Sequence, residues 1–250
     1  MRLIDDLSVL PPAYGLAVDE ALLESTRTTG VGAVRLWVND RSIIVGRAQA
    51  VDEEVDTGLA ATEGVPFLRR LSGGGAVFHH PGNLNVTVCV PGRLHLGGVE
   101  EAFLFLGRRV AESIASWGGG VRAEGNRLVS RGRKLGGAAQ VRRSGVLLYH
   151  TTVIVDADAL RMKRFLLAHR PGYAPMTVAS RPGMLTALSA ECGHSVKMDD
   201  VAESIGRAMV RHFALEPAGL TASEMRRAHR LVEEKYLEES WIWRRRAIST

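Results

Sequence analysis

The stretch RRLSGGGAVFHHPGNLN, residues 69–85, leads a predicted strand into a turn of three successive glycines. Because Gly73–Gly75 lack Cβ atoms, the backbone can bend sharply there and lie directly against a ligand. Consecutive N–H groups exposed in such a turn form a concave anion site, beside which Arg70 offers a planar cationic fork and Ser72 a hydroxyl. A ligand-free hairpin turn with solvated arginines is the alternative interpretation of this glycine turn (residues 72–76).

The sequence after the glycine turn excludes two familiar phosphate-binding loops. No Gly-Lys-Ser/Thr follows, as a Walker loop requires, and no helix is predicted directly after the glycines, as a dinucleotide fingerprint requires. From residue 83 onward, apolar and polar residues alternate, which predicts a strand with one polar face. The apolar face holds Leu84, Val86, Val88 and Val90, and the other face holds Asn85, Thr87 and Cys89.

The size and composition of the chain are those of a globular protein. With 250 residues, of which 46% are hydrophobic and 24% charged, we expect one large domain over residues 1–250, with two small domains as the alternative. No apolar run reaches the length of a membrane span, and the N-terminus lacks the apolar core of a signal peptide. Two cysteines, Cys89 and Cys192, provide neither a disulfide framework nor enough ligands for a thiolate metal site. These features predict a cytoplasmic protein with no membrane partner.

The charge of the chain is mildly basic and is supplied almost entirely by arginine. The net charge is +5, and only four of the 32 basic residues are lysines: Lys134, Lys163, Lys197 and Lys235. A solvated arginine-rich surface, an anionic small molecule or an acidic partner protein would each suit this charge. Aromatic residues make up only 6% of the chain and no binding motif is present, so we expect no nucleic-acid partner.

Hydrophobic periodicity predicts helices interleaved with strands. Helices are expected over residues 12–28, 53–61, 99–117, 157–168, 199–213 and 221–239. Strands are expected over residues 34–38 and 42–46, joined as a hairpin by Asn39-Asp40, and over 66–70, 128–130, 134–140 and 145–155. Because strands and helices do not alternate regularly, we expect an α+β fold with a mixed, largely antiparallel sheet flanked by helices.

A second polar segment, residues 126–140, contains the run Arg-Lys-Leu-Gly-Gly-Ala-Ala-Gln. A lysine beside small residues leaves room for a ligand against the backbone, and its compact ammonium group can bridge two oxygens. Since the chain uses arginine for nearly every cation, Lys134 is a candidate functional residue, with a solvated turn residue as the alternative. His150, in the middle of a predicted strand, is either a site residue or a satisfied core histidine.

These stretches together resemble the lipoate–protein ligase family of cofactor transferases. RRLSGGGAVFHHPGNLN, GRKLGGAAQ and LLYHTTVIV carry the resemblance, and LAVDEALL, LWVNDRSIIVGRAQ and SRPGMLTAL agree with the family in the same order. The resemblance covers nearly the whole chain. It implies the fold shared by biotin and lipoate ligases, which is class II synthetase-like.

The resemblance also implies a two-step reaction that uses ATP and Mg²⁺. The carboxylate of lipoate attacks the α-phosphate of ATP to give lipoyl-AMP and pyrophosphate, and the ε-amine of an acceptor lysine then attacks the mixed anhydride. The implied acceptor is a lipoyl domain or a glycine-cleavage-type carrier protein. Longer family members continue into a C-terminal accessory domain near the point where this chain stops. We therefore expect either a separate accessory polypeptide or a protein that works without one.

The residues suit these demands because two anions must meet in the first step, and cations and N–H donors must offset charge that is greatest in the transition state. Lys134 is the predicted catalytic residue, bridging the acyl carboxylate and the α-phosphate by charge and position. The other implied site residues are Arg70, Ser72, Gly73, Gly74 and Gly75 around the acyl and phosphate groups, Val77 and Phe78 near the adenine, His79 near the acyl chain, Asn83 and Asn126 on the phosphate or its metal, and Ala138, His150 and Thr151 toward the carboxyl end.

The chain departs from the family pattern at two places in the second polar segment. Family members usually carry Ser-Gly-Ser-Ala after the lysine, where this chain has Gly-Gly-Ala-Ala at residues 136–139, so side-chain hydrogen bonds are lost there. An aspartate commonly follows the asparagine at position 126, and Arg127 in its place weakens Asn126 as a metal ligand.

Two other functions compete with the ligase. An octanoyl or lipoyl transferase of the same fold needs no ATP but requires an exposed, activated cysteine near the lysine. Cys192 lies far from both motifs in sequence, and Cys89 has the pattern of a small core residue. A non-catalytic lipoate-binding module is compatible with the altered Gly-Gly-Ala-Ala run, although Arg70 and Lys134 are both present.

Overall fold

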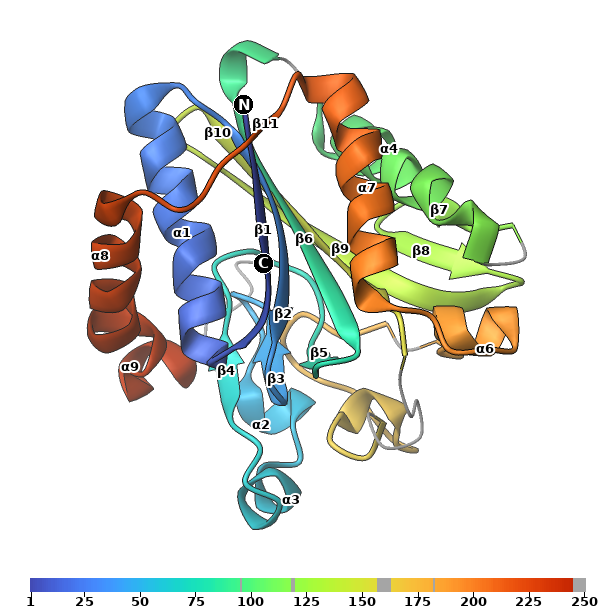
Figure 1. Cartoon of the computed structure of the whole chain (residues 1–250). Helices are drawn as coiled ribbons and strands as arrows, with labels where there is room; N and C mark the ends of the chain where they lie inside the picture. The colour runs from blue at the N-terminus through green and yellow to red at the C-terminus, as the bar shows by residue number, and fades with distance from the viewer. Residues whose placement is uncertain (95, 118–119, 157–162, 182, 245–250) are drawn as a thin grey trace.

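A computed structural model describes residues 1–94, 96–117, 120–156, 163–181 and 183–244, which form two sheets and the helices around them (Figure 1). The eight-stranded sheet has the order β11-β1-β2-β6-β10-β9-β8-β7, and the three-stranded sheet has the order β4-β3-β5. The strands of the large sheet are β1 (Arg2–Leu10), β2 (Ala33–Asn39), β6 (Asn83–Pro91), β7 (Arg122–Glu124), β8 (Arg127–Ser130), β9 (Arg133–Arg143), β10 (Val146–Ile154) and β11 (Glu216–Pro217). The strands of the small sheet are β3 (Ser42–Val45), β4 (Phe67–Arg69) and β5 (Val77–His79).

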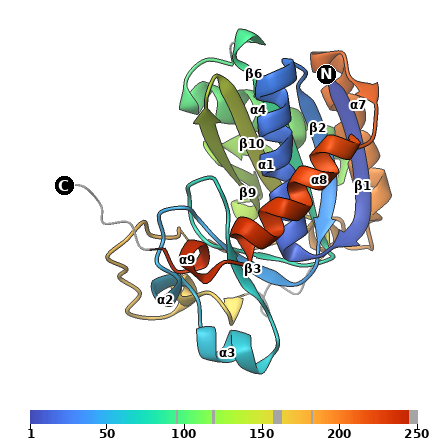
Figure 2. The ribbon, with the colours of Figure 1, turned by 90° about the vertical axis from the view of Figure 1, so that its left-hand side faces the viewer.

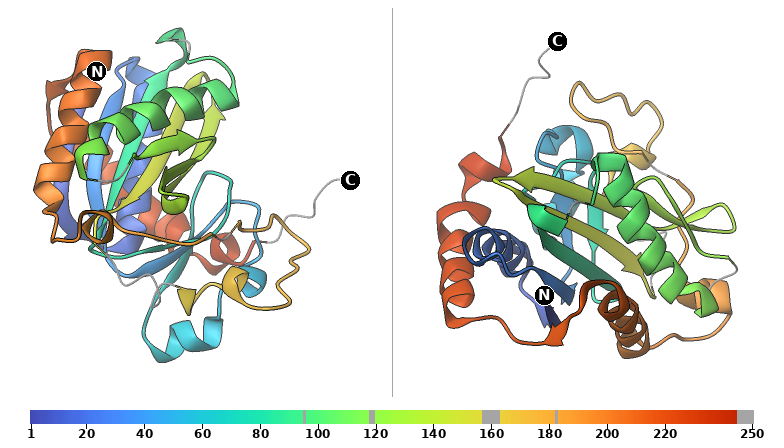
Figure 3. Two further views of the ribbon diagram at one scale, coloured as in Figure 1. Left: turned by 90° about the vertical axis from the view of Figure 1, so that its right-hand side faces the viewer. Right: turned by 90° about the horizontal axis from the view of Figure 1, so that it is seen from above.

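The large sheet is mixed and mostly antiparallel, which confirms the expected fold class. Strands β11, β1 and β2 pair in parallel, whereas every other pair in this sheet is antiparallel. The helices are α1 (Pro12–Thr29), α2 (Val51–Glu54), α3 (Thr57–Thr62), α4 (Val99–Ser113), α6 (Leu188–Cys192), α7 (Met198–Phe213), α8 (Ala222–Leu231) and α9 (Glu239–Ile242). Helices α1 and α8 lie on one face of the sheet, and α4 and α7 lie on the other (Figures 2 and 3).

The strand with one apolar and one polar face that the alternation after residue 83 predicts is β6. The side chains of Leu84, Val86, Val88 and Val90 pack beneath α4 and α7. The opposite face of β6 carries Asn85 and Thr87 and is also buried, because α1 and the small sheet cover it. A buried polar surface in the middle of the largest sheet is costly unless it is used or satisfied, so this face is the first place to look for a site.

The predicted hairpin of residues 34–38 and 42–46 is wrong, although both strands exist. Strand β2 pairs with β1 and β6 in the large sheet, whereas β3 pairs with β4 and β5 in the small one. The two strands therefore diverge at Asp40 instead of folding back on each other. Both strands are buried throughout, and each pairs with a neighbour on both of its edges. A two-stranded hairpin would leave one edge of each strand without hydrogen-bond partners.

Several predicted helices differ from the structure in their bounds. The helix predicted over residues 53–61 is two short helices, α2 and α3, because Val55 is extended and Asp56 caps the second helix by accepting from Leu59 N. The helix predicted over 99–117 ends at Ser113 and continues as a 3₁₀ turn, Ala115–Trp117. The helix predicted over 221–239 is α8 followed by a π-helical turn, Val232–Tyr236, and then α9.

The sequence prediction differs from the structure at two further segments, the predicted helix 157–168 and strand β1. Residues 157–162 of the predicted helix 157–168 lie outside the described residues; in the described part, Lys163 is helical and a 3₁₀ turn follows at Leu167–His169. Strand β1 was not predicted, since the adjacent Asp5 and Asp6 break the alternation expected of a strand. The strand is instead stabilised by parallel pairing with β2, and the register of this pairing shifts at a bulge after Asp6.

Buried ion pairs and carbonyl contacts fasten the C-terminal helices to the rest of the protein. Lys235 Nζ lies 2.8 and 2.7 Å from the two carboxylate oxygens of Glu20 on α1, and Tyr236 donates to the same carboxylate at 2.8 Å. Arg69, fully buried, donates to the carbonyls of Trp241 and Ile242 at 2.7–3.0 Å. No helix of the described part of the chain is long and apolar enough to cross a membrane.

Candidate active site

A cavity of about 790 Å³ lies on the polar face of the large sheet, between the glycine turn and the segment that follows β10. Most residues predicted for the site line this cavity: Arg70, Gly74, Gly75, Val77, Phe78, His79, Asn83, Asn126, Lys134, Ala138, His150 and Thr151. Ser72 and Gly73 are not part of the lining. The structure thus brings together two motifs that are more than fifty residues apart in sequence, the glycine turn and the lysine-bearing strand β9.

A β-bulge in β9 aims Lys134 into the cavity. Lys134 faces Val129 of β8, but the next pairing joins Gly136 to Leu128, so Leu135 is the extra residue. Leu135 is fully buried in the core beneath α4 and α7, which leaves the lysine on the opposite side. A bulge re-aims side chains in this way without ending the strand.

The backbone of Lys134 is hydrogen-bonded to the segment around residues 184–186. Its N–H donates to the carbonyl of Met184 at 2.6 Å, and its carbonyl accepts from Thr186 N at 3.0 Å. Glu191 braces both sides of this contact, because its carboxylate accepts from Thr186 Oγ1 at 2.6 Å and lies 2.7 Å from Arg133 Nη2. The position of the lysine is therefore fixed by backbone contacts rather than by its own side chain.

The side-chain amine of Lys134 has no partner in the parts of the chain that the structure describes. Burial lowers the pKa of Lys134, and the positive charges of Arg127 and Arg70 lower it further. A Cβ atom at position 137 would lie 3.3 Å from Lys134 Nζ, so Gly137 leaves the amine the space it occupies. A partly desolvated cation without a counter-ion in a cavity is poised to bind an anion.

Arg70, by contrast, donates most of its N–H bonds to the glycine turn and to strand β3. Its Nη1 donates to Ile44 O at 3.1 Å, its Nη2 to Gly75 O at 2.9 Å and to Gly73 O, and its Nε to Ser72 Oγ at 3.1 Å. These contacts use four of the five guanidinium N–H bonds. Burial and the neighbouring Arg69 lower the pKa of Arg70 to about 10, so it stays charged at neutral pH. Arg70 therefore shapes the wall of the cavity more than it offers charge to a ligand.

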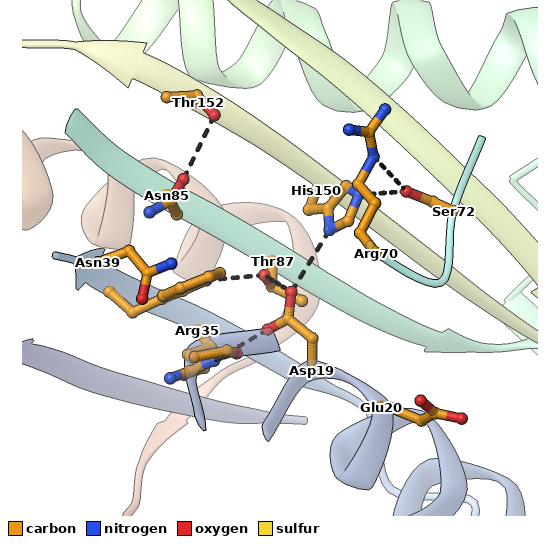
Figure 4. Close-up of polar contacts among 12 residues, drawn as sticks. Asp19, Glu20, Arg35, Asn39, Arg70, Ser72, Asn85, Thr87, His150 and Thr152 are labelled. Carbon is orange, nitrogen blue, oxygen red and sulfur yellow. Dashed lines mark hydrogen bonds and ion pairs between the residues drawn. The ribbon is translucent and has the colours of Figure 1, made fainter. Parts of the chain in front are cut away.

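A chain of polar contacts connects the glycine turn to helix α1 behind the cavity wall (Figure 4). Ser72 Oγ lies 2.6 Å from His150 Nε2, and His150 Nδ1 lies 3.4 Å from the Asp19 carboxylate. The order serine, histidine, aspartate is that of a nucleophile, base and orienting acid. Ser72, however, is fully buried, accepts from Arg70 and lies outside the cavity lining, so the arrangement is a brace for the glycine turn.

Asp19 belongs to the residues that sequence reasoning missed. Asp19 is a charged residue in the middle of α1, yet it is only 4% exposed. Its carboxylate accepts from Arg35 Nη1 at 2.9 Å and from Thr87 Oγ1 at 2.8 Å, and Thr87 in turn accepts from Trp37 Nε1 at 2.9 Å. Adjacent buried strands place these partners opposite α1, which no local pattern in the helix sequence indicates.

His79 is a neutral member of the cavity wall. Burial, together with the positive charge of Arg70, lowers the pKa of His79 to about 3, so the imidazole stays uncharged at physiological pH. Asn39 Nδ2 lies 3.4 Å from its Nδ1 atom. The neighbouring Asn83 donates from Nδ2 to Phe78 O at 2.9 Å and so ties β6 to β5.

Two arginines on the cavity wall were also missed as site residues. Arg181 follows Ser180 in the SRPGMLTAL stretch, whose agreement with the family was the available signal, and Arg127 follows Asn126. The neighbouring Ser180 attaches this segment to the glycine turn and to α2. Its hydroxyl accepts from Ala76 N at 2.7 Å and donates to Glu54 at 2.6 Å. Burial raises the pKa of Glu54 beneath this contact.

Ligands for a magnesium ion are sparse in the described part of the chain. No three His, Cys, Asp or Glu residues there are grouped so as to hold a metal. Glu124 and Asn126 line the cavity, but the carboxylate of Glu124 is engaged by Arg122 at 2.7 Å and Arg127 at 3.6 Å. Mg²⁺ commonly binds substrate phosphates together with one or two protein oxygens, and this donor set fits only that mode.

The unusual Gly-Gly-Ala-Ala run has a packing explanation. A Cβ atom at position 136 would lie 1.8 Å from the carbonyl oxygen of Thr152 on β10. The close approach of β9 and β10 therefore excludes any side chain at this position of the chain. Ala138, the second position without a hydroxyl, lines the cavity with its methyl group.

Neither cysteine belongs to the cavity lining that the structure describes. Cys89 is fully buried in the core beside α1, and burial raises the pKa of its thiol. Cys192 is at the end of α6, where its thiol contacts Trp117 O and burial raises its pKa as well. A raised pKa is the opposite of what a thiolate nucleophile requires.

Comparison with known proteins gives the family to which this fold and this cavity belong. The family model of the lipoyl protein ligase A/B catalytic domain matches residues 11–210. The chain therefore belongs to the lipoyl protein ligase A/B family, as its motifs indicated.

Relatives within this family carry two kinds of name. A protein of Aeropyrum pernix named "Putative lipoate-protein ligase A" is 38% identical over 72% of this chain and 69% of its own length. "Octanoyltransferase LipM" of Moorella thermoacetica is 28% identical over 96% of this chain and 97% of its own. "Lipoate-protein ligase A subunit 1" of Thermoplasma acidophilum is 26% identical over 90% of each chain.

Solved structures agree with the fold. A crystal structure of lipoate-protein ligase A bound with ATP has a TM-score of 0.80 at 24% identity, covering 96% of this chain and 97% of that one. The bi-partite lipoate protein ligase of Thermoplasma acidophilum, described with its E2 lipoyl domain, has a TM-score of 0.80 at 23% identity, covering 99% and 100%. At these identities the likeness establishes the architecture alone.

Proposed function

We propose that this protein is an ATP-dependent lipoate–protein ligase whose catalytic domain spans residues 1–250. In the first step a carboxylate oxygen of lipoate attacks the α-phosphorus of ATP, the bond to the β-phosphate oxygen breaks, and pyrophosphate leaves. In the second step the ε-amine of an acceptor lysine attacks the acyl carbon of lipoyl-AMP. An amide forms, AMP leaves and the amine loses a proton.

The observation that carries the proposal is the amine of Lys134, which has no partner among the described residues and lies in one cavity with the glycine turn. Its charge would lie between the acyl carboxylate and the α-phosphate, whose mutual repulsion opposes the first step. Because contacts with Met184 and Thr186 hold the backbone of Lys134, the residue is anchored at the cavity before the reactants arrive. Preorganised charge of this kind is an effective contribution to a charged transition state.

The remaining lining residues have roles that follow from their positions. Arg127 and Arg181 would neutralise phosphate oxygens, and Val77 and Phe78 would lie against the adenine. His79, which stays neutral, would border the uncharged acyl chain without attracting the phosphates. Mg²⁺, bound to the phosphates with Asn126 or Glu124 as a protein ligand, would supply further positive charge.

We further propose that the acceptor is a lipoyl domain or a glycine-cleavage-type carrier protein. The Thermoplasma acidophilum relative supports this, because it is described with an E2 lipoyl domain and as one subunit of a bi-partite ligase. A separate accessory polypeptide for this chain is part of the same proposal. No nucleic-acid or membrane partner is proposed, and the expected location is the cytoplasm.

A cysteine-dependent octanoyltransferase is the second candidate, favoured by the relatives named LipM. The positions of Cys89 and Cys192 outside the described cavity lining support the ligase over this alternative.

Mass analysis of an added lipoyl domain distinguishes the two activities. With lipoate, ATP and Mg²⁺, we expect a lipoylated domain and AMP, and no modification when ATP is omitted. A parallel reaction with an octanoyl thioester and no ATP should leave the domain unmodified. Octanoylation in that reaction, especially if it is lost in a double Cys89→Ala, Cys192→Ala variant, would replace the proposal by the transferase.

A further inference from the structure

The cavity has a cationic end and an apolar end, and the strand order separates them. Lys134 and Arg127 lie on β9 and β8, whereas Trp37 lies on β2 and Leu16 on the helix that covers it. In the sheet, β6 and β10 lie between β2 on one side and β9 and β8 on the other. An anionic head bound at the lysine would therefore direct an uncharged tail toward β6 and β2.

Asn85 is a polar residue at the apolar end of the cavity. Asn85 on β6 pairs with Trp37 of β2 on one side and with Thr152 of β10 on the other. Its side chain lines the cavity and the residue is 2% exposed. Thr152 Oγ1 donates to Asn85 Oδ1 at 3.3 Å, which fixes the orientation of the amide (Figure 4). Asn85 Nδ2 has no hydrogen-bond partner in the described chain.

The spacing of the strands matches a medium-length acyl tail. Strand β10 separates β9 from β6, so the distance from the lysine-bearing strand to Asn85 is two strand spacings, roughly 10 Å. A carboxylate held by Lys134 would thus place the far end of such a tail beside Asn85 Nδ2. This step rests on the proposed function, which puts the carboxylate at Lys134.

We propose that Asn85 is a specificity residue that donates from Nδ2 to a dithiolane sulfur and so selects lipoate over a hydrocarbon tail of the same shape. A divalent sulfur is a weak acceptor, whereas a methylene group is none. A hydrocarbon in this place would leave a buried N–H without a partner, and that loss corresponds to about a tenfold difference in affinity.

Direct binding of two acids that differ only in the sulfurs tests the proposal. We would measure the Kd of lipoate and of 5-cyclopentylpentanoate, its carbon isostere, for the full chain by calorimetry in the absence of ATP. The wild type should bind lipoate about tenfold more tightly. Asn85→Leu, which keeps the volume and removes the donor, should bring the ratio of the two Kd values close to one. Thr152→Val, which frees the amide to rotate, should give an intermediate ratio.

Equal affinities in the wild type, or a ratio that survives in a folded Asn85→Leu variant, would overturn the proposal. An unchanged ratio with a raised KM for ATP would overturn it too, and would place adenine at Asn85. If Asn85→Leu does not fold, the wild-type ratio still decides. Lipoate-dependent pyrophosphate release with equal affinities would sink this inference alone, whereas failure to bind either acid would contradict the proposed function as well.

Discussion

Arg70 and Lys134 are cations on the wall of the same cavity, yet their surroundings differ completely. Arg70 donates its N–H groups to Ile44, Ser72, Gly73 and Gly75, which belong to strand β3 and the glycine turn. Lys134 Nζ makes no contact of this kind within the described residues, and Gly137 keeps the space around it open. The comparison separates a cation that builds the site from one that remains available to a ligand.

The two residues differ in the hydrogen bonds that the protein would lose if each side chain were removed. Without Arg70, several buried carbonyls of the glycine turn would lack donors, and each unsatisfied group costs about 1–3 kcal/mol. Without Lys134, no protein group of the described chain loses a partner, and the folded state is relieved of a partly buried charge. The two cations therefore have opposite effects on folding and on chemistry, and substitutions can separate them.

The largest expected effect is the loss of activity in Lys134→Ala. Adenylate formation should fall by about a thousandfold or more, because the charge between the two reacting anions is gone. The melting temperature should stay close to that of the wild type. ATP–pyrophosphate exchange and thermal unfolding measure the two quantities. Lys197→Ala, at an exposed lysine outside the cavity, is the matched control and should change neither. Retained exchange in Lys134→Ala would remove the lysine from its proposed role.

Arg70→Met should do the reverse and act first on stability. We expect about 3 kcal/mol less unfolding free energy, since the carbonyls of the glycine turn lose their buried donor. Urea denaturation measures this change. A variant with wild-type stability and a lost affinity for ATP would show that Arg70 serves the ligand instead, and would erase the contrast with Lys134.

Substitutions at Gly136 and Gly137 should separate effects on stability from effects on activity in the same way, but with smaller changes in activity. In Gly136→Ala the new Cβ would meet Thr152 O at 1.8 Å, so we expect a loss of about 3 kcal/mol of unfolding free energy. In Gly137→Ala it would meet Lys134 Nζ at 3.3 Å, so the amine should shift and adenylation fall by about tenfold at nearly unchanged stability. Gly219→Ala, with no atom within 4 Å of the new methyl group, is the control. Equal effects on stability at positions 136 and 137 would contradict the account.

The smallest expected effect is on the pH above which activity falls, which should be lower than for an ordinary lysine. Since the pKa of Lys134 is lowered by burial and by Arg127, the charged amine should be lost, and the rate should fall, at a pH below the usual 10.5 of lysine. Between the lowered pKa and 10.5 the unfolded chain binds a proton that the folded chain does not, so stability should rise with pH in that window. Arg127→Gln removes a like charge and should move the limit to higher pH in a pH–rate profile. A limit unmoved by Arg127→Gln would assign it to another group.

Local patterns in the sequence were sufficient for most elements of the fold, but not for their pairing. The strand after residue 83 and helix α1 follow from alternation and helical periodicity, and both are confirmed. The separation of β2 and β3 into different sheets depends on partners far away in the chain, such as β6 and β4. The turn residues Asn39 and Asp40 indicate only that the chain bends.

The same limit explains what the sequence predicted of the site. Lys134 stands out because it is a rare lysine beside glycines, and the structure puts it in the cavity. The saturation of Arg70 could not be predicted, because one of its acceptors is the carbonyl of Ile44, a backbone atom with no signature in the sequence. Asp19 was missed for a related reason, since its partners come from strands that meet α1 only in the folded protein.

The most direct test of the central claim is pyrophosphate release from ATP by the purified chain, measured with and without lipoate and Mg²⁺. The account predicts release that depends on lipoate in the wild type, persists in Lys197→Ala and disappears in Lys134→Ala while that variant keeps its fold. Lipoate-dependent release at the wild-type rate by Lys134→Ala would contradict it.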